Sequence, residues 1–142
     1  MTQEEKELLL KDLCARLPYG VICKDTNINV TGTLSQIGLH YDMCVLDKDN
    51  GDSESCYILN CKPYLFPLSS MTEEQLFEVQ EILGKNEIKI EDSFLRIVDS
   101  DRNTISYLEI LALFEWFNKN HFDYRGLIPM GLANDATGLD IY

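Results

Sequence analysis

The hydrophobic residues at the start of the chain repeat at the spacing of an amphipathic helix. They lie three or four positions apart and form one stripe, which consists of Leu9, Leu10, Leu13 and Leu17. Thr2 and Glu5 have the spacing of a capping box, in which each side chain accepts a hydrogen bond from the other residue's backbone N–H. The pattern therefore predicts a helix over residues 3–16, which ends where Pro18 and Gly20 follow.

From residue 21 to residue 61, hydrophobic residues occur in short runs that alternate with polar residues and are separated by turn residues. This alternation predicts strands at 21–23, 28–34, 41–46 and 55–61. Gly32 indicates a bulge or a sharp bend in the second strand. The dipeptide at 50–51, Asn-Gly, is a strong signal for a hairpin between the last two strands.

The pattern changes from strand spacing to helical spacing within residues 62–75. Because Pro63 and Pro67 cannot donate a backbone hydrogen bond, we expect the sheet to end or to present an edge there. Thr72 opens a second capping box, and the apolar residues after it predict a helix that ends at Gly84. The apolar residues between the two prolines are expected to form a plug at this junction: Tyr64, Leu65 and Phe66.

Two further elements are expected before an irregular tail. The apolar residues between 87 and 98 predict one or two strands. Ser106 and Glu109 form a third capping-box pattern, which opens a helix from Tyr107 to about Lys119. This helix is apolar nearly all round, which is typical of a helix that is buried or that faces an interface. The tail from residue 121 is rich in glycine and is expected to pack across the domain without regular structure.

These elements predict a single α+β domain over residues 1–142. Its parts are an N-terminal helix, a small bent antiparallel sheet of about four or five strands, two further helices and an irregular C-terminal tail. An SH3-like barrel is one form that such a sheet takes.

Composition and charge exclude some partners. The chain has 142 residues, 45% of them hydrophobic, and a formal net charge of -12. An acidic surface disfavours direct binding to nucleic acid, which requires Lys and Arg to displace counterions. It also disfavours docking on anionic lipid. The first residues are acidic rather than basic, and no apolar run approaches the length of a membrane span. We therefore expect a cytoplasmic protein.

Five cysteines are present, and their spacing does not match that of zinc or redox motifs. They are Cys14, Cys23, Cys44, Cys56 and Cys61. Because no pair has C-x-x-C spacing, and each residue lies among apolar or strand-like neighbours, we expect small buried thiols in the reduced state. The two histidines, His40 and His121, are not at metal-ligand spacing. The sequence therefore predicts no metal site and no cofactor.

Two acidic segments resemble cation sites only superficially. The segment at 99–105, DSDRNTI, opens like a calcium loop, but Thr104 stands where a glycine is required and Ile110 stands where a bidentate glutamate is required. We expect a polar turn that leads into a helix cap. The carboxylates around the turn at 50–51 are expected to form a solvated hairpin tip; these are Asp47, Asp49, Asp52 and Glu54.

The segment at 121–125, HFDYR, concentrates residues that can serve either packing or chemistry. Its first interpretation is a structural tail after a helix end. The second is a partner surface formed by Phe122, Tyr124 and Arg125, since aromatic residues and arginine dominate binding hot spots. A third is acid–base catalysis that uses His121 and Asp123 together with Tyr124 and Arg125. The sequence contains no nucleophile elbow and no phosphate-binding loop, so we assign no catalytic residue.

Three segments together carry a resemblance to a known family. They are EEKELLLKDLCARLPYGV at 4–21, KPYLFPLSSMTEEQ at 62–75 and WFNKNHFDYRGLIPMGLA at 116–133. These strings resemble small hypothetical proteins of gut Bacteroides and their relatives, which are often encoded in prophages and other mobile elements. Residues 24–61 and 84–115 carry no part of the resemblance. It implies a phage-linked or mobile-element-linked origin in a bacterial cytoplasm, and it implies no activity, cofactor or catalytic residue.

Three functional hypotheses follow. The first is a non-enzymatic accessory protein that acts through contacts with another protein, because the surface is acidic and the tail is rich in aromatic residues. The second is an acidic inhibitor of a host defence protein, which imitates nucleic acid and requires the 24 carboxylates to lie on one face. The third is a small enzyme that uses the segment at 121–125.

Overall fold

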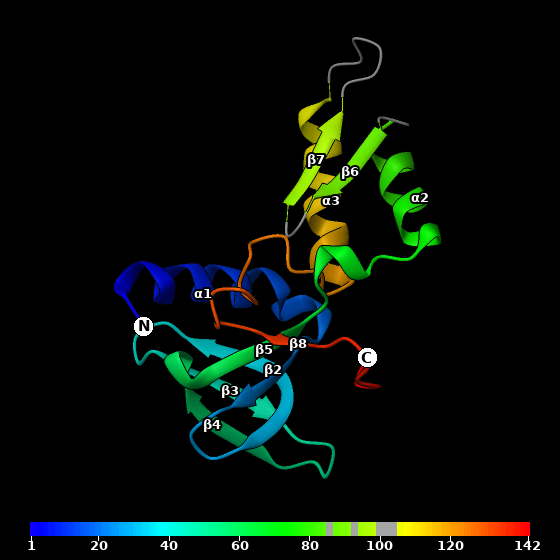
Figure 1. The fold of residues 1–142 in the computed structure, drawn as a ribbon. Coiled ribbons are helices and arrows are strands. Elements are labelled where there is room, and N and C mark those ends of the chain that lie inside the picture. The colour runs from blue at the N-terminus through cyan, green and yellow to red at the C-terminus, as the bar shows by residue number, and fades with distance from the viewer. Residues whose placement is uncertain (85–86, 92–93, 99–104) are drawn as a thin grey trace.

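The structure is a computed structural model, and it describes residues 1–84, 87–91, 94–98 and 105–142. A curved sheet and a long helix form one half of the molecule, and two helices with a two-stranded sheet form the other half (Figure 1). The α+β class is therefore confirmed. Within the described residues, the main sheet has six strands and the second sheet has two, which is more than the four or five strands expected.

Helix α1 (Gln3–Arg16) has the bounds that the hydrophobic stripe predicts. Both hydrogen bonds of the capping box between Thr2 and Glu5 are present. The helix ends in a 3₁₀ turn at Leu17–Tyr19, after which Gly20 has a left-handed backbone with φ of 67°. Leu9 and Leu13 are fully buried against the sheet, so the stripe forms one side of the core.

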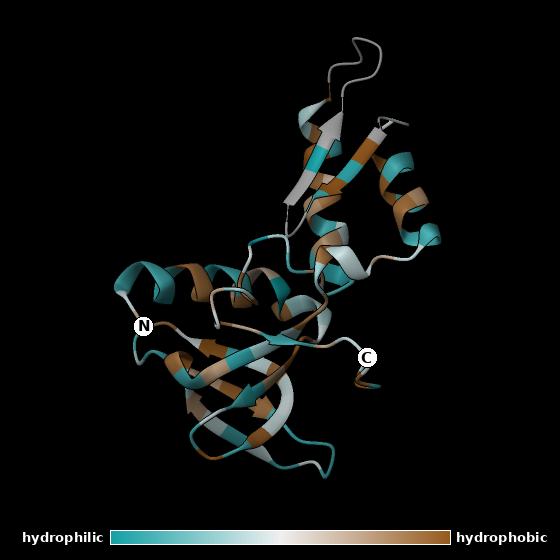
Figure 2. Cartoon of the chain, viewed as in Figure 1, coloured by the Kyte–Doolittle hydropathy of each residue, from teal (hydrophilic) through white to brown (hydrophobic). Residues whose placement is uncertain are grey.

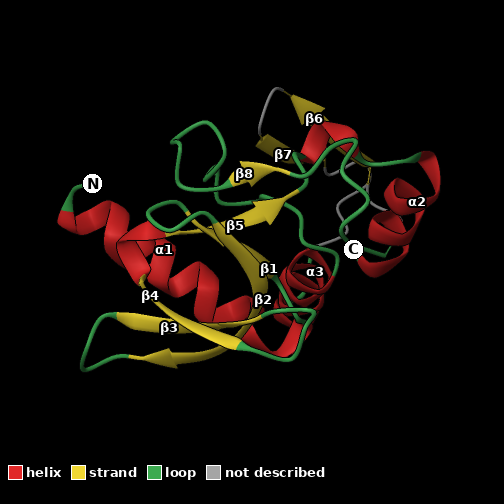
Figure 3. Ribbon diagram, turned by 90° about the horizontal axis from the view of Figure 1, so that it is seen from below, coloured by secondary structure: helices red, strands yellow, loops and turns green. Residues whose placement is uncertain are grey.

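Five consecutive strands form most of the main sheet, and the tail adds a sixth. The strands are β1 (Ile22–Asp25), β2 (Val30–Gly38), β3 (Met43–Asp47), β4 (Ser53–Tyr57), β5 (Cys61–Leu65) and β8 (Asn134–Asp135). Their order is β4-β3-β2-β1-β5-β8, and all pairs are antiparallel except β5 with β8. A 3₁₀ turn at Ile58–Asn60 separates β4 from β5. Figure 3 shows that these strands curve strongly and that α1 lies alongside them.

Two glycines shape the hairpins, one of them in an unexpected way. The predicted hairpin between β3 and β4 is confirmed: the Gly51 N–H donates to the Lys48 carbonyl at 3.0 Å, and Gly51 is left-handed with φ of 87°. Gly32 does not mark a bulge, because the register shift of β2 lies between Leu34 and Gln36. A Cβ at Gly32 would lie 2.6 Å from the Asp47 carbonyl oxygen, so glycine is required there by the close approach of β3.

The main sheet continues through the first proline, and β5 ends at Leu65, within the stretch where we expected the sheet to end or to present an edge. Pro63 is buried within β5, opposite Cys23 of β1. The Thr26 N–H donates to the Asn60 carbonyl at 3.0 Å, so hydrogen-bonded pairs alternate along this ladder and Pro63 falls at a position that needs no donor toward β1. On its other side, pairing with β8 begins only at Tyr64. The missing N–H of Pro63 therefore faces the side of β5 that has no partner strand at this residue, so the proline costs the sheet no hydrogen bond.

The second half of the molecule is built around its own apolar cluster. Its elements are α2 (Glu73–Ile82), β6 (Glu87–Glu91), β7 (Phe94–Val98) and α3 (Tyr107–Lys119). β6 and β7 pair as an antiparallel hairpin. Hydrophobic positions recur along α2 and α3 in Figure 2. The buried residues of this cluster are Leu68, Val79, Leu83, Ile88, Leu113, Phe117 and Phe122.

Residues 62–75 join the sheet to the second cluster, as the sequence predicts. Leu65 is fully buried in the first cluster, and Phe66 packs against the second. The Phe66 N–H donates to the His121 carbonyl at 2.9 Å, and its carbonyl accepts from the Asp123 N–H at 2.8 Å. A 3₁₀ turn at Leu68–Ser70 then leads to α2. The junction therefore consists of backbone pairing with the tail as well as apolar packing.

We predict that Thr72→Ala lowers the free energy of unfolding by about 1 kcal/mol, because the Thr72 hydroxyl accepts the Gln75 N–H at 3.2 Å and so caps α2. Urea denaturation measures the change. Thr137→Ala, in an exposed loop, is the matched control and should change stability by less than about 0.5 kcal/mol. Equal losses in the two variants would contradict a specific role for this cap.

Candidate functional sites

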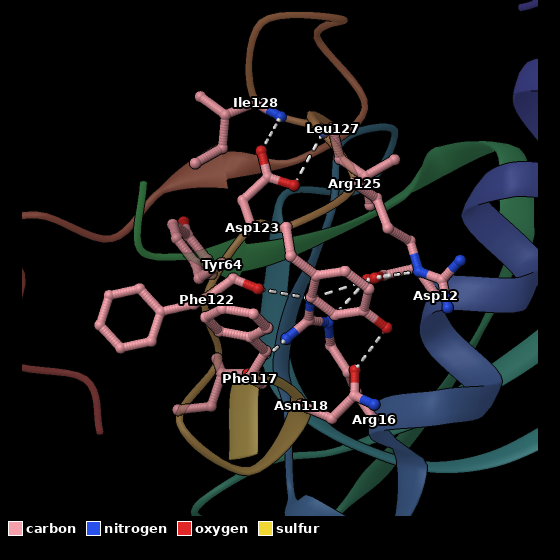
Figure 4. Close-up of polar contacts among 12 residues, drawn as sticks. Asp12, Arg16, Tyr64, Phe117, Asn118, Phe122, Asp123, Arg125, Leu127 and Ile128 are labelled. Carbon is pink, nitrogen blue, oxygen red and sulfur yellow. Dashed lines mark hydrogen bonds and ion pairs between the residues drawn. The ribbon is translucent and has the colours of Figure 1, made fainter. Parts of the chain in front are cut away.

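A fully buried ion pair connects the two halves of the molecule. The Arg16 guanidinium on α1 donates to both carboxylate oxygens of Asp12, at 2.8 and 3.1 Å, and both side chains are 0% exposed (Figure 4). The same guanidinium donates to the Phe117 carbonyl at 3.3 Å and to the Phe122 carbonyl at 2.8 Å. A cation at the carboxyl end of α3 is favourable because the last carbonyls of a helix have no partners within the helix.

The tail after α3 is ordered by Asp123, which is 3% exposed. Its carboxylate accepts the Leu127 N–H and the Ile128 N–H, each at 2.8 Å (Figure 4). Two charge-assisted hydrogen bonds to backbone fix the following turn. The structure therefore uses this carboxylate for folding of the tail, and we assign it no catalytic role.

The three residues of the expected partner surface do not lie together on an exposed face. Phe122 is only 2% exposed, and its ring stacks on Trp116 with the centroids 5.5 Å apart. Tyr124 and Arg125 are half-buried, and the Arg125 guanidinium lies 4.9 Å from the centroid of the Tyr124 ring. The Arg125 Nε is also 3.3 Å from Asp12. The Phe122 and Tyr124 rings pack back onto the helix that precedes them, so only Tyr124 and Arg125 of the three remain partly accessible.

His121 is also turned into the packing. Its ring stacks on Tyr142 with the centroids 3.9 Å apart, and its Nδ1 is buried without a hydrogen-bond partner. Burial, together with the positive charge of Arg16, lowers the pKa of His121 from 6.5 to about 4. The imidazole is therefore neutral near pH 7, and it stabilises the end of the chain by stacking.

Three cysteines form a cluster that the sequence did not predict. The sulfur atoms of Cys44, Cys56 and Cys61 all lie within 4.8 Å of one another, and they are the only His, Cys, Asp or Glu group of this kind among the described residues. The Cys44 and Cys56 sulfurs are 3.2 Å apart. Cys23 is buried too, whereas Cys14 is exposed, so the expectation of a buried thiol is wrong for that residue. The three cysteines come from three different strands, β3, β4 and β5, so their spacing in the sequence matches no motif.

The thiols of this cluster hold their protons at neutral pH. The hydrogen bond with Cys56 lowers the pKa of Cys44, but the hydrogen bond with Cys61 and burial outweigh it and raise the pKa to about 12. For Cys56, the hydrogen bond with Cys44 raises the pKa and the hydrogen bond with Cys61 lowers it. Burial raises it further, so the pKa of Cys56 is also about 12. Without a cation, the cluster is therefore neutral, and its thiols are poor nucleophiles.

The acidic hairpin tip between β3 and β4 gives no support for a cation site. Asp47, Asp49 and Asp52 are exposed around the turn between β3 and β4. Asp47 accepts a hydrogen bond from Ser53 at 2.7 Å, and Asp52 accepts one from Asn50 at 2.8 Å. These contacts are typical of a solvated hairpin tip, as expected. In the calcium-like segment, residues 99–104 lie outside the described residues.

One side of α3 is apolar and exposed. Tyr107 is 72% exposed and Leu108 is 75% exposed, and Leu111 and Phe114 continue the same stripe at helical spacing. The opposite side of α3 carries the buried Leu113 and Phe117. One side of α3 is therefore buried, as one part of the expectation stated, and the other side is exposed and free to face an interface. We call the stripe of Tyr107, Leu108, Leu111 and Phe114 the outer face of α3.

Comparisons of this chain with protein-family models, with curated proteins and with solved structures found no match. The family resemblance of the three sequence segments therefore stays a prediction. Among the helices within the described ranges, none has the length and apolar character needed to cross a membrane.

We predict that Asp12→Asn lowers the free energy of unfolding by about 3 kcal/mol or more, because it leaves a buried guanidinium without its counter-charge. Denaturant unfolding measures the loss. Asp42→Asn is the matched control, since Asp42 pairs with Lys6 at the surface and its side chain is 50% exposed. The control should cost no more than about 1 kcal/mol. A similar cost for both variants would show that the buried pair is dispensable.

The lowered pKa of His121 predicts a specific acid sensitivity. The unfolded chain binds a proton near pH 6.5, whereas the folded protein binds it only near pH 4, so stability falls as the pH decreases between these values. The loss should reach roughly 2–3 kcal/mol at pH 4. His121→Asn tolerates the left-handed backbone, with φ of 58°, and removes this titration. Urea unfolding at several pH values should show a shallower decline for the variant than for the wild type; parallel curves would contradict the assignment.

Proposed function

We propose that this protein is a non-enzymatic accessory protein, encoded by a phage or another mobile element, that acts in the bacterial cytoplasm by binding another protein. The resemblance of its three sequence segments supports the origin. The outer face of α3 supports the mode of action. The exposure of this apolar face is the single observation on which the proposal mainly depends.

Exposure of a large apolar stripe to water is unfavourable in free energy, and such a stripe commonly marks a binding site. The outer face of α3 consists of two aromatic and two aliphatic residues at consecutive helical positions, and all four side chains are more than 40% exposed. A helix that presents anchors at this spacing suits insertion into an apolar groove of a partner.

The face is presented on a rigid base, which supports a binding role. On its buried side, α3 packs through Leu113 and Phe117, and its carboxyl end is held by Arg16. A helix that is already fixed in the free protein loses little conformational entropy on binding.

Charge defines the partner that fits. The outer face is bordered by the exposed Glu115 and the half-buried Glu109, on a chain with a net charge of -12. We therefore propose a partner with an apolar groove that is rimmed by Lys and Arg, because opposite charges speed association and suppress wrong partners. A second copy of this chain is disfavoured, since two acidic molecules repel each other.

We also propose that β1–β5 form an SH3-like barrel. Support comes from the strand order β4-β3-β2-β1-β5, in which β1 to β4 are consecutive neighbours and β5 returns to pair with β1. The 3₁₀ turn between β4 and β5 also supports it. The approach of the Cys56 and Cys61 sulfurs to within 4.8 Å also supports closure between the first and last of these strands.

The test uses a double substitution on the outer face, Leu108→Glu with Leu111→Glu. Its matched control is Leu39→Glu with Leu59→Glu, which charges two exposed leucines of the half of the molecule that contains the sheet. Wild type and both variants serve as baits in native host cells, and any captured protein is purified and titrated by calorimetry. We expect the outer-face variant to bind the captured protein at least about tenfold more weakly, and the control to bind like the wild type.

Stability and self-association are measured on the same samples. All three proteins should be monomeric in sedimentation experiments and should unfold at similar denaturant concentrations. The proposal fails if the outer-face variant binds the captured protein as tightly as the wild type, or if both variants lose binding equally. Dimerisation of the wild type that the outer-face substitution abolishes would also overturn it, because the face would then serve self-association.

A further inference from the structure

All four buried cysteines of the chain lie in the core beneath the sheet, and none lies in the second apolar cluster. Cys44 is 1% exposed, Cys56 is 3% and Cys61 is 0%. A core that needed only small apolar residues would have no reason to bring the sulfurs to one point. The cluster therefore calls for an explanation in terms of sulfur chemistry.

The fold brings these sulfurs together over long distances in the sheet. Cys44 and Cys56 are direct register partners on β3 and β4. Cys61 begins β5, which is separated from β4 by three strands in the hydrogen-bonding order. In a flat sheet, four strand spacings would place β5 roughly 19 Å from β4. The Cys61 sulfur instead lies within 4.8 Å of both others, so the cluster sits where the curved sheet closes on itself.

The separations suit a single thiophilic ion. Zinc binds thiolate sulfur at about 2.3 Å, which places the sulfurs of a tetrahedral site ~3.8 Å apart. The Cys44 and Cys56 sulfurs are 3.2 Å apart, and no two sulfurs of the cluster are more than 4.8 Å apart. The Cys23 thiol interacts with that of Cys61, which makes Cys23 a candidate for a fourth ligand. Small side-chain rotations would therefore bring the three sulfurs of the cluster into ligand positions.

The geometry points to a structural zinc site formed by Cys44, Cys56 and Cys61. The divalent ion offsets the charge of thiolates in an interior where isolated charges are strongly disfavoured. A disulfide between Cys44 and Cys56 would involve only two of the three sulfurs and would leave the position of Cys61 unexplained. The ion would tie β3 and β4 to the start of β5 and so hold the curved sheet closed.

Because the sulfurs are almost inaccessible, zinc enters as the protein folds, and binding adds directly to stability. The experiment therefore uses refolding. Full-length protein is unfolded with reductant and chelator, freed of chelator, and refolded without oxygen in the presence of one equivalent of Zn²⁺ or Co²⁺, or without metal. Metal content after desalting, the denaturation midpoint and the sulfur-to-cobalt charge-transfer absorption are measured.

We expect one zinc ion per chain, a higher denaturation midpoint with zinc than without it, and strong charge-transfer absorption with cobalt. Cys44→Ala and Cys61→Ala should weaken zinc binding by more than about 100-fold, since even residues that only orient ligands change affinity by 10- to 100-fold. Cys14→Ala removes an exposed thiol outside the cluster and is the matched control, which should bind zinc like the wild type.

If the cluster variants do not refold, the wild type and Cys14→Ala decide the question alone, because cobalt absorption intensity increases with the number of thiolate ligands. Intensity typical of three or more thiolates supports the site. Wild-type protein that refolds to the same midpoint with and without zinc and retains no metal overturns it. A Cys44–Cys56 disulfide in place of metal in freshly isolated protein, detected by intact mass, overturns it as well.

Discussion

A buried charge is strongly disfavoured unless it is paired and hydrogen-bonded, and the buried Arg16 meets this condition only through contacts with distant parts of the chain. Its guanidinium is held by Asp12 one helical turn away and by the carbonyls of Phe117 and Phe122, about a hundred residues later. The side chain therefore requires α1, the end of α3 and the start of the tail to occupy one arrangement. Apolar packing alone would tolerate small shifts between the two halves, whereas these hydrogen bonds would not.

The position of the tail follows from this constraint. Once the Phe122 carbonyl is fixed, the neighbouring residues pair with Phe66, and Asp123 closes the next turn. The chain then returns to the main sheet, where β8 pairs with β5. The segment at 121–125, which resembles a binding motif in the sequence, therefore joins the sheet to the helices.

The proposed binding face and the proposed zinc site lie in different halves of the molecule and depend on different physical causes. The outer face of α3 remains apolar and exposed because the opposite side of the same helix already fills the second cluster. The sulfur cluster exists because a curved sheet brings β4 and β5 together in the first cluster. A partner would therefore contact the half of the molecule that contains α2 and α3, while the metal would stabilise the main sheet in the other half.

The features that the sequence alone predicts correctly depend on interactions between residues that are close together in the chain. Three capping boxes, at Thr2, Thr72 and Ser106, and the helices that they open depend on residues three or four positions apart. The position of Pro63 inside the sheet, the strand at Asn134–Asp135 and the burial of Phe122 depend instead on pairing with distant segments. The cysteine cluster is the clearest case, because its members are separated in the sequence and meet only where β4 and the start of β5 approach each other. The periodicity of hydrophobic residues indicates which side of a helix or strand is apolar. Only the tertiary structure decides which of those apolar sides is buried against other elements.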